Sequence, residues 1–194
     1  MTRPFLGLIL GLQMLAGAAA AYDIRPQEQV RLERFDETVG AALLEAFQTG
    51  AQEDVAALTQ ALSGTPDIAF APSLQGDWNC RTMKLGGPAK LVVYTNFKCR
   101  ITLDIAGARF EKLSGSQRTS GRIDIIDGRP VYLGVGYVAS ETPQDYAELP
   151  PDFRGNGTIQ PDVAVFERVS DTRARLMFPA PVNESLLDVL ELTR

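Results

Sequence analysis

Residues 93–105 read VYTNFKCRITLDI, and this stretch has the clearest two-residue period in the chain. Its apolar residues alternate along the chain and would share one face of a strand: Val93, Phe97, Cys99, Ile101, Leu103 and Ile105. The residues between them are mostly polar. Because the side chains of a strand point alternately to its two faces, the stretch predicts a half-buried antiparallel strand.

Similar short runs, separated by turn residues, recur from Gly76 onward. Together with 93–105 they make about eight predicted strands: 77–85, 110–113, 122–126, 131–139, 163–169, 173–178 and 186–192. Sequential strands joined by short turns favour a meander. Eight such strands can close into a barrel that is either filled by side chains or holds one small ligand. One long connection, residues 140–157, contains several Pro and Gly and shows no period.

Residues 26–63 carry apolar side chains at helical spacing instead. Gly50 interrupts this pattern, and Gly64 followed by Pro66 ends it. Glycine readily takes the left-handed conformation that often follows the last turn of a helix. The segment therefore predicts a helical hairpin, with the first helix ending at Gly50 and the second at Gly64.

The N-terminus has the pattern of a secretory signal peptide. Arg3 precedes an apolar stretch over residues 5–16, and small residues follow through Ala21. Ala18-x-Ala20 and Ala19-x-Ala21 both suit cleavage, so the cleavage site stays open between them. The apolar run is shorter than the roughly 20 residues that cross a bilayer, so we expect no stable membrane insertion after cleavage. The predicted localisation is periplasmic or secreted.

The predicted fold class is α+β, an N-terminal helical hairpin followed by an antiparallel barrel of about eight strands. The signal peptide would occupy residues 1–20, the hairpin and its connector 21–75, and the barrel 76–194.

Composition excludes several classes of function. The chain has no histidine, so Ser-His-Asp and Cys-His nucleophile arrangements and imidazole metal ligands are excluded. It is acidic, with 24 Asp and Glu against 19 Lys and Arg, and we expect no nucleic-acid partner. No Gly-rich phosphate-binding motif occurs, and we expect no cofactor and no metal.

Cys80 and Cys99 are the only two cysteines. In an exported chain the expected state of such a pair is a disulfide, which would stabilise the fold by roughly 3 kcal/mol. If Cys80 lies directly opposite Cys99 in a hairpin, then Trp78 lies opposite Ile101, and all four side chains point inward. The same register places Lys84 on the inward side.

The sequence Gly76-x-Trp78 at the start of a predicted eight-stranded meander resembles the calycin or lipocalin pattern. That resemblance implies that Trp78 closes one end of the barrel. It also implies that an arginine of a late strand, Arg173 or Arg175, packs across the tryptophan.

Four further segments resemble a family of exported Gram-negative bacterial proteins known as a domain of unknown function. These segments are Gly76-Asp77-Trp78-Asn79-Cys80-Arg81-Thr82, Phe97-Lys98-Cys99-Arg100-Ile101, Gly115-Ser116-Gln117-Arg118 and Arg173-Ala174-Arg175-Leu176. The resemblance spans most of the mature chain. It implies export and a common fold, and it implies no activity, substrate or catalytic residue.

Cationic residues on neighbouring predicted strands are the candidate ligand-binding set: Arg81, Lys84, Arg100, Lys112 and Arg118. Concentrated positive charge on an acidic protein could hold a carboxylate or phosphate. The alternative is a solvated strand face whose charges, with that of Lys98, pair with nearby acids, and the sequence favours this alternative. By alternation, Arg81 and Arg100 would point away from the barrel interior.

Two functional hypotheses remain open. In the first, the protein is a non-catalytic binding module for a small, anionic or amphipathic ligand. In the second, the barrel is filled and the protein is an interaction module that contacts an envelope protein through its cationic face or its Pro-rich loop. A cavity of at least about 300 Å³ with Lys84 in its wall would favour the first.

A carboxylate-pair enzyme is a third and less favoured hypothesis. It would draw on acidic residues near the long loop: Asp124, Asp127, Glu141, Asp145, Glu148 and Asp152.

Overall fold

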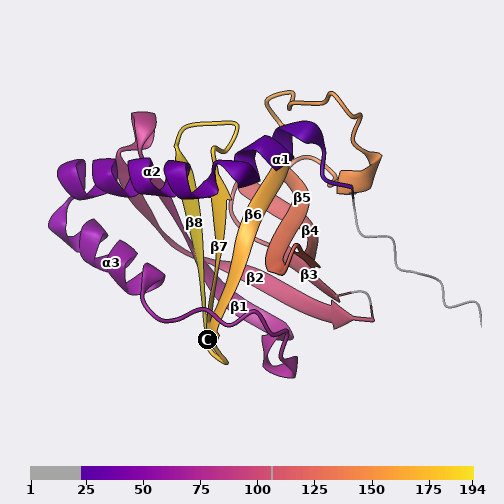
Figure 1. Ribbon diagram of the computed structural model, residues 1–194, viewed down its shortest axis with the longest axis horizontal. Helices are drawn as coiled ribbons and strands as arrows, with labels where there is room; N and C mark the ends of the chain where they lie inside the picture. Colours follow the sequence, from indigo (N-terminus) through magenta and orange to yellow (C-terminus); the bar gives the residue numbers. More distant parts are fainter. Residues whose placement is uncertain (1–22, 106) are drawn as a thin grey trace, which may run out of the picture.

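The computed structural model describes residues 23–105 and 107–194. Within this part, three α-helices come first and eight strands follow, closing into a single barrel (Figure 1). The α+β class with a helical segment followed by an antiparallel barrel is therefore confirmed. The predicted signal peptide, residues 1–20, lies outside the described residues.

The strands follow one another around the barrel in chain order. They are β1 (Gly76–Leu85), β2 (Leu91–Asp104), β3 (Gly107–Lys112), β4 (Gln117–Ile126), β5 (Arg129–Val138), β6 (Ile159–Ser170), β7 (Arg173–Pro179) and β8 (Leu187–Thr193). Every neighbouring pair is antiparallel, and β8 pairs with β1 to close the ring. Closure gives each strand a hydrogen-bonded neighbour on both sides.

The pairing of β1 with β2 differs by two residues from the predicted register. Cys80 lies opposite Phe97, and Trp78 lies opposite Cys99. The disulfide between Cys80 and Cys99 therefore runs diagonally, with the two Cα atoms 5.9 Å apart. A shift of two residues leaves the cysteines on their predicted face, so they still point inward.

A bulge corrects the prediction that Val93 shares a face with Phe97. Pairing shifts between Arg81 and Met83, where β2 contains one extra residue. Beyond the bulge, Val93 packs with the outward cluster beneath the helices, whereas Phe97 packs against the barrel interior.

The helical segment forms α1 (Pro26–Glu33), α2 (Phe35–Thr49) and α3 (Gln52–Leu62). The first predicted helix is thus divided at Arg34. Gly64 has the expected left-handed backbone, with φ of 93°. Gly50 does not, since its φ is −74°. Glycine is needed there because a Cβ would lie 2.6 Å from the backbone oxygen of Ala46. It would also lie 2.7 Å from Leu91 of β2, so the turn between α2 and α3 packs directly on the sheet.

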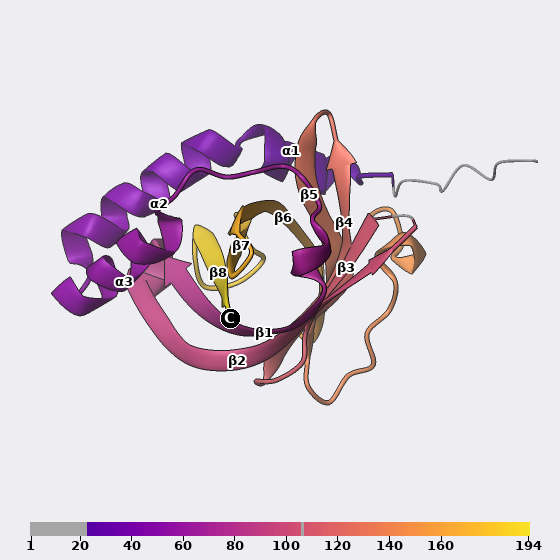
Figure 2. The same ribbon diagram turned by 90° about the horizontal axis from the view of Figure 1, so that it is seen from below.

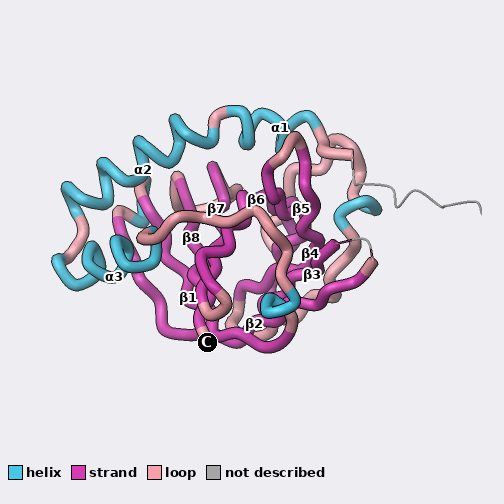
Figure 3. The backbone as a smooth tube through the Cα atoms, turned by 60° about the horizontal axis from the view of Figure 1, so that its bottom comes forward, coloured by secondary structure: helices cyan, strands magenta, loops and turns pink. Residues whose placement is uncertain are grey.

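The helices lie along the outer wall of the barrel, over β1, β2 and β6 to β8 (Figure 2). Figure 3 shows them gathered on one side of the strands. Phe35, Ala42 and Leu58 are buried there against outward side chains such as Met83 and Val189. No helix in the described residues has the length and apolarity needed to cross a bilayer.

The long connection between β5 and β6 packs on the outer wall. Its short helix, η3 (Tyr146–Glu148), places Tyr146 against Leu133 and Val135. The Tyr146 hydroxyl donates to Glu28 of α1 at 3.2 Å. The Pro-rich loop is therefore attached to the start of the helical segment.

Candidate functional site

The barrel interior has an apolar end and a polar end. Trp78, Phe110 and Leu192 belong to the apolar core, near the C-terminus. The polar end faces the turn between β7 and β8, which lies at the same end of the barrel as α1 and the long loop (Figure 1). The polar end opens to solvent through a cavity, and the apolar core lies deeper in the barrel.

Trp78 is buried in the apolar core of the barrel. Its Nε1 donates to the carbonyl of Leu74 at 2.9 Å. The guanidinium of Arg194 lies 3.9 Å from the centre of its ring, a cation–π contact. Arg194 also donates to the carbonyls of Ser73, Leu74 and Gln75. These contacts fix the connector across the end of the barrel.

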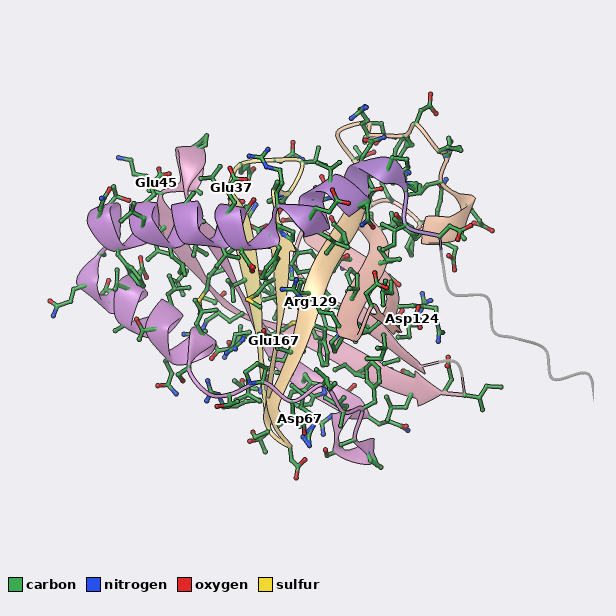
Figure 4. All side chains as sticks on the ribbon, in the orientation of Figure 1. Glu37, Glu45, Asp67, Asp124, Arg129 and Glu167 are labelled. Atoms are coloured by element: carbon green, nitrogen blue, oxygen red, sulfur yellow. A yellow bond between two sulfur atoms is a disulfide. The ribbon has the colours of Figure 1, made fainter. Side chains whose placement is uncertain are left out.

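The arginine over Trp78 is thus Arg194, and the expectation for Arg173 or Arg175 is corrected. Arg175 alternates outward and pairs with Glu167, a residue that Figure 4 labels on the outer wall. Arg175 and Arg173 both donate to carbonyls at the end of α3. They satisfy the carbonyls that a helix leaves unpaired at its C-terminus.

A cavity of about 120 Å³ occupies the polar end. This volume is below the roughly 300 Å³ at which drug-sized ligand sites begin. Six polar side chains from five strands line it: Thr82, Lys112, Gln117, Thr119, Asp162 and Asp188. The cavity is the size of about four water molecules in the liquid and suits a ligand of few atoms.

Lys112 projects into this cavity from the end of β3. It follows Ala108 and Phe110 in the inward alternation and is 7% exposed. Its Nζ donates to the backbone carbonyls of Ser114 and Gln117 and lies 4.0 Å from the centre of the Phe97 ring. Among the described residues no carboxylate forms an ion pair with Lys112.

The environment disfavours the charge on Lys112. Loss of solvent around the ammonium, together with the positive charges of Arg118 and Lys84, lowers the pKa of Lys112 to about 8. At neutral pH most Lys112 side chains still carry a proton, so a positive charge faces the cavity without a counter-ion.

Lys84 also points inward, as predicted, but its charge is balanced. Its Nζ pairs with the Glu184 carboxylate of the β7–β8 turn and donates to Gln117 Oε1 at 3.2 Å. Desolvation acts to lower the pKa of Lys84, but the bond to Glu184 and the charge of Asp188 outweigh it, and the pKa is raised. Lys84 therefore stays protonated and links β1 to the turn.

Two carboxylates face the same cavity from β6 and β8. Asp162 accepts a hydrogen bond from Thr119 Oγ1 at 2.7 Å, and Thr119 in turn bonds the Tyr132 hydroxyl at 2.7 Å. Burial raises the pKa of Asp162. Asp188 accepts from Ser185 Oγ, and burial raises the pKa of Asp188 to about 6. For both acids the surroundings thus disfavour the charged form.

Two glycines of β5 make room for these groups. A Cβ on Gly134 would lie 2.2 Å from the Tyr132 hydroxyl oxygen, and a Cβ on Gly136 would lie 2.7 Å from the Asp162 carboxylate. The residues beside them on β5 that pack outward are Leu133 and Val135. The absence of a side chain at Gly134 and Gly136 therefore leaves room for Tyr132 and Asp162 in the barrel interior. It does not make room for the helices on the outer wall.

The cationic residues expected to act together are divided by the barrel wall. Lys84 and Lys112 point inward, while Arg118 lies at the rim and donates to the carbonyl of Gly115. Arg81 and Arg100 point outward, and each pairs with an acid, Glu191 and Asp77 respectively. The outer residues thus form the paired strand face that was the alternative expectation.

The sequence reasoning overlooked Asp162 and Asp188. The signal was present, because each is an acidic residue in the inward alternation of a strand, ahead of Ala164 and Leu190 respectively. The acids proposed from the long loop do not line the cavity. In the described part of the chain, no group of three or more Cys, Asp or Glu gathers as a metal site would require.

Comparison with known proteins identifies a family. The family model described as Domain of unknown function (DUF4893) matches residues 21–192. No curated protein matches the chain, and no solved structure matches it. The resemblance to lipocalins therefore stays a prediction.

Proposed function

We propose that this chain, which belongs to the Domain of unknown function (DUF4893) family, is a non-catalytic binding module for a small ligand that carries an anionic group. The observation that carries the proposal is Lys112, a buried lysine that faces an open cavity and has no acidic partner among the described residues. Proteins seldom bury a charge without a partner, because the loss of hydration is costly. A bound anion would supply that partner.

The cavity size restricts the ligand. A volume of about 120 Å³ admits a compact molecule or the charged end of a longer one. Of the ligands first considered, a small anion fits better than an amphipathic molecule bound along its whole length. The second hypothesis, an envelope interaction module, has less support, because Arg81 and Arg100 are already paired.

Export to an oxidising compartment is part of the proposal. The Cys80–Cys99 disulfide supports it, since such bonds persist mainly outside the reducing cytoplasm. The signal-peptide pattern of residues 1–20 supports the same conclusion. We therefore propose a periplasmic or secreted location.

The test is calorimetric titration of the folded protein at pH 7 with acetate and with phosphate. The Lys112→Met variant should bind either anion at least about tenfold more weakly, the usual effect of losing one charged hydrogen-bond donor. Lys98→Met is the matched control, since Lys98 is exposed on the outer face and its side-chain Nζ donates to Asn79. Equal affinity of wild type and Lys112→Met for these anions would overturn the proposal.

A further inference from the structure

The cavity has two walls of opposite charge. Lys112 belongs to β3, whereas Asp162 and Asp188 belong to β6 and β8. In a ring of eight strands in chain order, β3 lies across from β7, and β6 and β8 flank β7. The lysine and the two carboxylates therefore face each other across the cavity. None of the ion pairs among the described residues joins Lys112 to either carboxylate, so a gap separates them.

The other charges near the cavity do not cancel this polarity. Lys84 pairs with Glu184. Arg31 of α1 lies outside the wall, where it donates to the carbonyls of Pro161 and Pro179, and its charge acts on Asp162. Among the described residues that line the cavity, Lys112 and Arg118 on one side and Asp162 and Asp188 on the other form no ion pair.

A simple anion would form favourable contacts with only the positively charged wall of the cavity. It would bind Lys112, but it would also add a negative charge to a small space that already holds two carboxylates. Like charges at such separations oppose binding, and Asp188 would stay without a donor other than Ser185. A ligand that also carries a positive group would remove both penalties.

We infer that the cavity binds a small zwitterion, a molecule with one carboxylate and one protonated amine, as in a small amino acid. This inference rests on the proposed anion site at Lys112 and assigns the second half of the ligand to Asp188, with Asp162 beside it. The carboxylate accepts from Lys112, and the amine donates to Asp188.

The first experiment compares matched probes by calorimetric titration of the whole protein at pH 7. Glycine, β-alanine and γ-aminobutyrate vary the distance between the two charges, and acetate, propionate and butyrate lack the amine. We expect at least one zwitterion to bind tenfold or more tightly than its matched carboxylate. If every carboxylate binds as tightly as its zwitterion, the inference is wrong and the anion site stands. If no probe binds, both proposals are wrong.

The second experiment uses two variants. Asp188→Asn keeps the size of the side chain and should reduce the preference for the zwitterion to less than about twofold, while binding of the plain carboxylate is retained or strengthened. Lys112→Met should weaken both kinds of probe. Asp152→Asn, an exposed position on the long loop, is the control and should behave as wild type. An unchanged preference in Asp188→Asn would overturn the assignment of the amine to that residue.

The pH profile separates a direct role from a structural one. Asp188 is surrounded by Lys84, Asp162, Glu184 and Arg31, and Lys112 by Lys84 and Arg118. Protonation of Asp188, with a pKa of about 6, should weaken β-alanine binding at lower pH. Deprotonation of Lys112, with a pKa of about 8, should weaken it at higher pH. Propionate should lose affinity only at the high-pH side, and a matching low-pH loss for propionate would contradict the inference.

Discussion

At the scale of single residues, the cavity contains charges that make folding harder. Burial raises the pKa of Asp188 and lowers that of Lys112, so in each case the charged form is the disfavoured one. A hydrophobic or amide side chain would fit these positions at lower cost. Residues whose charge costs stability while facing a cavity are typical of binding sites, where the ligand offsets that cost.

Asp188→Asn should therefore stabilise the ligand-free protein at pH 7. Between about pH 4 and 6 the folded state holds a proton on Asp188 that the unfolded state releases, so stability falls as the pH rises through this range. At pH 7 the full penalty is present. We expect the variant to raise the free energy of unfolding by roughly 1 to 2 kcal/mol, a figure reduced for partial solvent screening.

Guanidinium unfolding at pH 7 and at pH 4 measures this effect. The gain should be present at pH 7 and should shrink at pH 4, where the wild-type side chain is protonated in the folded state. A variant that is less stable than wild type at pH 7 would show that burial does not penalise the Asp188 charge.

At the scale of elements, a single strand of this barrel contacts both the interior and the segments that cover the outer wall. The bulge in β2 turns Val93 toward the helices while Phe97 and Cys99 face inward. In β5, the inward side carries Tyr132, Gly134 and Gly136, and the outward side packs against the long loop. The residues that each strand points inward thus determine how much space remains in that part of the barrel interior.

Gly134→Ala should destabilise the protein, because the new methyl would overlap the Tyr132 hydroxyl. We expect a loss of roughly 1 to 3 kcal/mol, as for other overpacked interiors. Gly40→Ala is the matched control. A Cβ at Gly40 of α2 meets nothing within 4 Å, and alanine favours helix, so we expect a gain of about 0.5 to 1 kcal/mol. Thermal or guanidinium unfolding of both variants measures the contrast, and equal stabilities would contradict it.

At the scale of the whole molecule, the barrel depends on pairs that are far apart in the chain. The closing pair joins β1 to β8, with Asn79 opposite Thr193. The disulfide lies next to this seam, between β1 and β2, and both of its cysteines are fully buried. A covalent link at this position lowers the conformational entropy of the unfolded chain around β1. β1 is the strand that must pair with β8, which is far away in the sequence.

Replacing both cysteines, Cys80→Ala with Cys99→Ala, should lower the free energy of unfolding by about 3 kcal/mol, the chain-entropy value for a loop of this length. Because the two cysteines are buried, we also expect the folded wild-type protein to resist reduction until it opens. Guanidinium unfolding with and without dithiothreitol measures both effects. A double variant as stable as wild type would refute the stabilising role of the bond.

Local patterns in the sequence were enough to predict the class of fold. Alternation of apolar and polar residues located all eight strands, and helical spacing located the helical segment, because both periods arise from neighbours in the chain. The same alternation predicted that Cys80, Cys99 and Lys84 point inward. A register error of two residues left these predictions intact, since it does not change the face on which a side chain lies.

The placement of Lys112 across the cavity from Asp188, and the contact of Arg194 with Trp78, came only from the folded barrel. Alternation places each of the inward residues on a face, but it does not say which strand lies across the interior or at which height a side chain sits. Those relations depend on the stagger of the eight strands in the closed barrel. That stagger is the total of the register offsets between all neighbouring strands. A cavity with opposite charges on its walls is a property of that closure, and no single stretch of the chain contains it.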